Sequence, residues 1–64
     1  MAVINGETVQ SAGKTLLEYL EEAGYESSRV VVERNLEIVP QDQLGAVMIQ
    51  DDDAIEVLRF VGGG

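Results

Sequence analysis

The chain has 64 residues, enough for one domain with a small core, since domains of this length bury only about 60% of their unfolded surface. It contains no cysteine and no histidine, which excludes disulfides, thiolate metal sites and the commonest general base, so self-contained catalysis is not expected. A formal net charge of −8 argues against nucleic acid as a partner. It would steer a protein partner with a basic face toward the domain, or it serves only to maintain solubility.

The sequence also bears on where the protein works. No apolar run approaches the ~20 residues of a membrane span, so we expect no membrane partner. The first four residues lack a basic segment and are typical of a strand rather than a signal peptide. A cytoplasmic location is therefore predicted.

The first predicted element is a hairpin around Asn5-Gly6. Both residues accept positive φ, which a type I′ turn requires, and they separate predicted strands over 2–4 and 7–10. Partners across such a turn share one face of the sheet. The core candidates in this hairpin are Ala2, Ile4 and Val9.

A helix is predicted over 16–23. Thr15 followed by Glu18 has the pattern of a capping box at its start, and Gly24 is a natural C-cap. The expected apolar stripe consists of Leu16, Leu17, Leu20 and Ala23, which repeat at helical spacing.

A second pair of strands is predicted over 30–34 and 37–39, joined at Asn35-Leu36. The first of these is rich in β-branched residues. Leu36 is an awkward residue for this turn, because a type I′ turn would place it at positive φ. Pro40 cannot donate to a ladder and ends the second strand.

The segment from 41 to 49 is predicted to be irregular or one short helical turn. Its expected anchors in the core are Leu44, Val47 and Ile49. The acidic run Asp51-Asp52-Asp53 could bind Mg²⁺ or Ca²⁺, but it lacks the glycine and the distal glutamate of a calcium-binding loop. A solvated turn is the favoured interpretation, with no metal site.

The last predicted strand covers 54–60, and its side chains alternate between two faces. Ile55 and Val57 belong on the face that the helix covers, which leaves Leu58 and Phe60 on the opposite face. Two alternatives remain open: the Leu58-Phe60 pair is a docking patch for a partner, or the segment 41–49 folds over it.

Domain organisation follows from the end of the chain: a folded domain over 1–60 and a glycine tail over 61–64. Glycine has no Cβ, so the four residues Val61, Gly62, Gly63 and Gly64 form a thin thread that extends at most ~13 Å and could enter a narrow slot. The functional interpretation makes the carboxylate of Gly64 the reactive group. The alternative is a frayed terminus.

The order of elements, with a crossover that places the last strand parallel to the first, resembles the α+β, β-grasp fold of ubiquitin. That fold would be a mixed sheet of about four to five strands with one main helix on one face. Within it, the chain resembles the ThiS family of sulfur carriers in thiamine biosynthesis. The most specific matching stretches are Glu37-Ile38-Val39-Pro40 and the ending Phe60-Val61-Gly62-Gly63-Gly64. The chain departs from the family pattern at Leu36 and Asp52, where glycine is usual.

The resemblance implies a carrier without catalytic residues of its own. A ubiquitin-activating-like adenylating enzyme of the ThiF/MoeB type would join Gly64 to AMP from ATP. A sulfur donor, such as a persulfide supplied by a cysteine desulfurase, would then convert Gly64 to a thiocarboxylate. Thiazole synthase, of the ThiG type, would take up the sulfur. The carrier itself would bind no cofactor, and Leu58 and Phe60 would dock.

Three alternatives accompany this prediction. The carrier subunit of molybdopterin synthase shares the fold and the tail chemistry, but its family is usually longer and often has prolines before the last glycines. A non-catalytic β-grasp interaction module would tolerate loss of Gly64. A small metal-dependent enzyme built on Asp51 to Asp53 would bind divalent ions and act without a partner.

Overall fold

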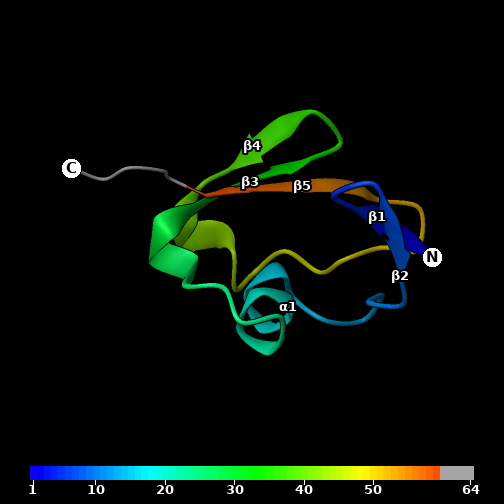
Figure 1. Cartoon of the computed structure of the whole chain (residues 1–64), viewed down its shortest axis with the longest axis horizontal. Coiled ribbons are helices and arrows are strands. Elements are labelled where there is room, and N and C mark those ends of the chain that lie inside the picture. The colour runs from blue at the N-terminus through cyan, green and yellow to red at the C-terminus, as the bar shows by residue number, and fades with distance from the viewer. Residues whose placement is uncertain (60–64) are drawn as a thin grey trace.

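The computed structural model describes residues 1–59 and shows one mixed five-stranded sheet with a short helix beneath it (Figure 1). The strand order is β2-β1-β5-β3-β4. The elements are β1 (Ala2–Ile4), β2 (Glu7–Val9), α1 (Leu16–Glu22), the 3₁₀ turn η1 (Ser27–Arg29), β3 (Val30–Arg34), β4 (Glu37–Val39), the 3₁₀ turn η2 (Gln41–Gln43) and β5 (Ala54–Arg59). Phe60, the predicted last residue of the final strand, lies outside the described residues.

Strand β5 is the central strand of the sheet. It pairs in parallel with β1, as the predicted crossover requires, and antiparallel with β3. The two hairpins therefore lie on either side of β5, with β2 and β4 at the edges. Both hairpins are therefore held in the sheet through their hydrogen bonds to β5.

The first hairpin has the predicted register, with Ala2 opposite Val9 and Ile4 opposite Glu7. Ala2 and Ile4 are buried, as predicted, whereas Val9 is only partly buried and packs against the margin of the core. The reason is position: β1 is next to the central strand, and β2 is an edge strand.

Helix α1 begins with the predicted capping box. The Glu18 amide donates to Thr15 Oγ1 at 3.1 Å, and the Thr15 amide donates to Glu18 Oε1 at 2.9 Å. The helix ends one residue earlier than predicted, with Ala23 as its C-cap and Gly24 at φ +88°. Ala23 is consequently exposed, and its predicted place in the buried stripe is wrong, because the chain turns away from the sheet there.

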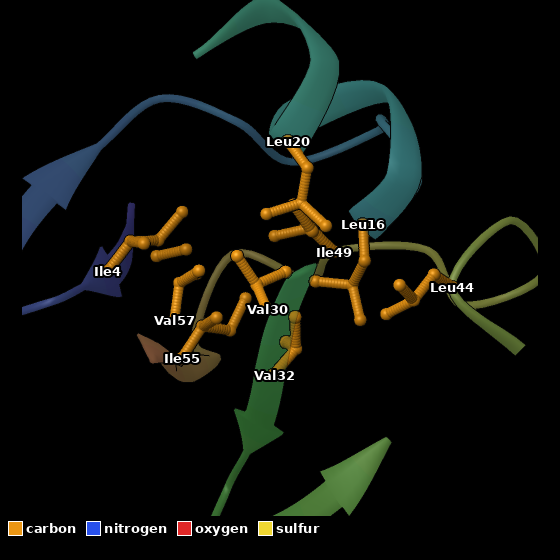
Figure 2. Packing of buried hydrophobic residues seen from close by; sticks show 10 residues of the cluster. Ile4, Leu16, Leu20, Val30, Val32, Leu44, Ile49, Ile55 and Val57 are labelled. Atoms are coloured by element: carbon orange, nitrogen blue, oxygen red, sulfur yellow. The ribbon is translucent and has the colours of Figure 1, made fainter. Parts of the chain in front are cut away.

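The core lies between the sheet and α1 (Figure 2). Leu16 and Leu20 reach down from the helix, and Leu44 and Ile49 come from the segment between η2 and β5. From the sheet side they meet Ile4, Val30, Val32, Ile55 and Val57. Full burial of one such side chain stabilises the fold by about 1.5–3 kcal/mol, so this small cluster is the main stabilising feature of the domain.

The predicted anchors of the segment 41–49 are therefore confirmed for Leu44 and Ile49, while Val47 is partly buried. These side chains hold the segment on the same side of the sheet as α1 (Figure 1). It does not cover Leu58, which lies on the opposite face and is 50% exposed. No helix within residues 1–59 combines the length and the apolar character needed to cross a membrane.

Candidate functional site

One face of the sheet carries no covering layer among residues 1–59, and we call it the open face. Strand alternation decides which side chains it presents, because their neighbours in sequence enter the core. Its central side chains are Val3 from β1, Val31 and Glu33 from β3, Ile38 from β4, and Glu56 and Leu58 from β5. Ile38 and Leu58 are 67% and 50% exposed, which leaves apolar surface available to a partner.

A shallow groove of about 470 Å³ is hollowed into the open face between the two hairpin turns. Gly6 of the first turn and Leu36 of the second stand on its sides. Its lining also includes Val3, Glu33, Ala54 and Glu56. The groove therefore combines apolar walls with two carboxylates.

Those two carboxylates belong to a directly opposed pair, since Glu33 of β3 is the cross-strand partner of Glu56 of β5. Like charges in this relation repel and destabilise the sheet. Neither glutamate has a salt-bridge partner among residues 1–59. The acidic pair is thus a local electrostatic cost in the centre of the open face.

The four basic side chains of the chain are all engaged elsewhere. Lys14 pairs with Glu22, and Arg29 pairs with Glu26 at 3.1 Å. Arg34 Nε lies 2.8 Å from Asp53 Oδ2, and the Arg59 guanidinium stands 4.7 Å from the centre of the Tyr25 ring. A counter-charge for the Glu33–Glu56 pair must therefore come from outside the described residues, and the sequence of 60–64 contains no basic residue.

The second turn forms with a leucine in a position that glycine usually occupies. Asn35 and Leu36 have φ of +53° and +71°, close to the +52° and +82° of Asn5 and Gly6. A left-handed conformation costs a non-glycine residue roughly 1–2 kcal/mol. Leu36 is also 93% exposed, so no burial in the free domain offsets that cost.

The predicted solvated turn at Asp51 to Asp53 is wrong for Asp53, which is only 3% exposed. Its carboxylate accepts hydrogen bonds from Arg34 Nε, Asn35 Nδ2 and the Gln50 amide, at 2.8, 3.0 and 2.8 Å. These partners lie up to 19 residues away, which local turn chemistry does not reveal. Asp51, by contrast, is exposed and pairs with the N-terminal ammonium at 3.0 Å.

Asp53 keeps its charge in spite of this burial. Burial alone would raise its pKa, but the hydrogen bonds from Arg34, Gln50 and Asn35, together with the charge of Arg34, outweigh it and lower the pKa below the ordinary value. With Asp53 turned inward, the acidic run does not gather into a metal site. Within residues 1–59 no three acidic side chains are placed to hold a metal ion.

Both turns fasten β5 through an asparagine side chain, a feature that sequence reasoning missed. Asn5 Oδ1 accepts from the Val57 amide at 2.8 Å, and Asn35 Oδ1 accepts from the Ala54 amide at 2.9 Å. Each asparagine amide donates in turn, to Tyr25 Oη at 3.4 Å and to Asp53 Oδ1 at 3.0 Å respectively. The repeated asparagine at the first turn position was the one available signal.

Of the other predicted site residues, only Leu58 lies within the described residues. Leu58 lies on the open face at the end of β5 that leads toward the tail. Phe60, Val61, Gly62, Gly63 and Gly64 lie outside the described residues, so their roles stay predictions. The site that the structure describes is therefore the open face with its groove. The central strand β5 forms part of this face and leads in sequence to the tail.

The sheet order, the single covering helix and the parallel β1–β5 pair define a β-grasp domain of the ubiquitin type. A ThiS-family crystal structure from Geobacter metallireducens shares this fold, with a TM-score of 0.77 and 33% identity over 98% of this chain and 97% of that one. The predicted fold class is thereby confirmed.

The particular family follows from the sequence match: the ThiS family model covers residues 2–64, and the chain belongs to the ThiS family. Bacillus subtilis "Sulfur carrier protein ThiS" is 36% identical across the full length of both chains. "Thiazole synthase" of Paramagnetospirillum magneticum is 48% identical over 97% of this chain, which spans only 19% of the length of that relative.

Proposed function

We propose that this protein is a sulfur carrier for thiamine thiazole synthesis, with the carboxylate of Gly64 as the group that carries the sulfur. The observation that carries this proposal is the family match, which extends through the glycine tail to residue 64. A ThiS-like segment within a relative named for thiazole synthase favours the thiamine pathway over the molybdopterin pathway.

The chemistry begins with activation, because a carboxylate resists nucleophiles. An adenylating partner would let the Gly64 carboxylate attack the α-phosphorus of ATP, releasing pyrophosphate and forming an acyl-adenylate. A persulfide sulfur would then attack the acyl carbon, and AMP would leave. A thiol would reduce the resulting S–S bond and free the thiocarboxylate, which thiazole synthase would use.

The carrier's own residues would contribute recognition rather than catalysis. The chain has neither histidine nor cysteine, so acid–base and persulfide steps fall to the partners. Gly62 and Gly63 would let the tail enter a narrow active site, and the open face would hold the domain in place. We place these reactions in the cytoplasm, where ATP is available to the adenylating enzyme.

The test is an intact-mass measurement. The purified protein is incubated with its adenylating enzyme, ATP and a persulfide donor, and should gain the mass of one oxygen-to-sulfur exchange, located on Gly64 by fragmentation. A variant that lacks Gly64 should gain nothing in the same reaction. An unchanged mass of the wild type, with an adenylating enzyme shown to be active on another carrier, would refute the proposal.

A further inference from the structure

We propose that the groove between the two turns is a docking site for a protein segment that presents one basic side chain, preferably arginine, flanked by apolar side chains. The inference rests on the proposed function in one respect: the partner is taken to be the adenylating enzyme that acts on the tail. The residues that line the groove define the chemistry of the occupant.

The charges that line the groove favour a basic occupant. Glu33 and Glu56 oppose each other across β3 and β5, and all four basic side chains of the chain are engaged elsewhere. A guanidinium between the two carboxylates would convert their repulsion into two charge-assisted contacts. The free domain therefore offers a binding position for a cationic side chain between Glu33 and Glu56.

Leu36 lies on one side of the same groove and offers an apolar contact to the occupant. It combines a left-handed backbone with a nearly fully exposed apolar side chain, and the first turn of this domain shows that glycine serves the same geometry. An unfavourable conformation that persists at a surface points to a role in binding. Leu36 would lie against the apolar part of the incoming segment.

The groove lies on β5, the strand that leads in sequence to the tail. Glu56 precedes Arg59, the last residue of β5, by three residues, a distance of ~10 Å along the strand. A partner that binds in the groove would therefore contact the domain at the groove and bind the tail at a second site. Apolar side chains between the two points, Leu58 and Val31, are cross-strand partners and continue the same surface.

The experiment measures affinity for the purified adenylating enzyme by calorimetry, without ATP. The double variant Glu33→Gln/Glu56→Gln should bind about tenfold more weakly at low salt, with a flatter dependence of Kd on salt. Leu36→Gly should weaken binding about fivefold. Both variants should nevertheless melt at a higher temperature than the wild type, because repulsion or backbone strain is removed.

The control variants remove two charges, or shorten one exposed apolar side chain, outside the open face. Glu21→Gln/Asp42→Asn removes two charges from α1 and η2, and Met48→Ala truncates an exposed apolar side chain of the segment beside α1. Both controls should bind within twofold of the wild type. Equal loss in the charge control would reduce the effect to general steering by net charge and overturn the groove.

The outcomes separate this inference from the proposed function. Wild-type affinity in the groove variants, with normal sulfur loading, overturns the groove and leaves the function intact. Weakened binding with no sulfur loading of the wild type supports the groove and refutes the function. A wild type that does not bind the adenylating enzyme overturns the groove as its docking site.

Discussion

The two hairpin turns have nearly the same backbone but differ at one residue, Gly6 in the first and Leu36 in the second. Both begin with an asparagine whose side chain accepts from a β5 amide. The glycine in the first turn adopts the required positive φ without strain. The leucine in the second turn adds strain and exposed apolar surface to an otherwise equivalent structure.

The turns also differ in the group that accepts a hydrogen bond from the asparagine side-chain amide. Asn5 donates to the Tyr25 hydroxyl over 3.4 Å, whereas Asn35 donates to the buried, charged Asp53 over 3.0 Å. A hydrogen bond to a charged acceptor is stronger than one between neutral groups. The second turn thus has the stronger support and the less favourable turn residue. This support explains how Leu36 is kept at positive φ.

The largest effect is expected for Asp53→Ala, which removes the support of the second turn. Three donors lose their acceptor and Arg34 loses its ion pair, so the free energy of unfolding should fall by about 2 kcal/mol, or roughly 10 °C in Tm. Chemical denaturation measures the change. The matched variant Asp51→Ala breaks only an exposed pair and should stay within about 0.5 kcal/mol. Equal effects of the two variants would contradict the buried network.

The same carboxylate predicts an acid sensitivity. The pKa of Asp53 is lower in the folded state than in the unfolded chain, so folding favours its ionised form. Its contribution is complete above the unfolded pKa of about 4 and is lost as the pH falls through the lower, folded value. The difference in stability between wild type and Asp53→Asn should therefore shrink below about pH 4. A difference that stays constant down to pH 2 would rule out this linkage.

The next largest effects compare the asparagines, using glycine to keep the positive φ. Asn35→Gly should cost about 1.5 kcal/mol, because it removes bonds to the Ala54 amide and to charged Asp53. Asn5→Gly should cost about 1 kcal/mol, because only one of its two bonds is short. Thermal unfolding of the two variants side by side measures the difference. A larger loss at Asn5 would reverse the ranking of the two turns.

The smallest effect concerns the turn residues themselves. Leu36→Gly should stabilise the fold by about 0.5–1 kcal/mol, the strain relieved less the chain entropy that glycine adds to the unfolded state. Gly6→Leu should destabilise it by about the same amount, because a Cβ at Gly6 meets no atom within 4 Å and only the φ of +82° opposes it. Urea titrations measure both, and same-sign changes would contradict the account.

Local signals predicted most of the architecture. Asn5-Gly6 identified the first turn, Thr15 and Glu18 identified the start of the helix, and alternation assigned Ile55 and Val57 to the covered face, all confirmed by the structure. These features depend on residues within a few positions of one another, where backbone preference and hydrogen-bonding chemistry are read directly. The resemblance to the ThiS family, confirmed by the family match, rested on short motifs of the same kind.

Long-range contacts decided the rest. Asp53 lies in an acidic run that is typical of a solvated turn, and only its proximity to Arg34 and Asn35 makes it a buried acceptor. Ala23 has helical spacing but lies just past the end of α1. Whether Leu58 is open depended on which side of the sheet the segment 41–49 takes, and two buried anchors decided that. The groove itself exists only because the sheet order brings two distant turns to either side of β5, a relation that no local pattern encodes.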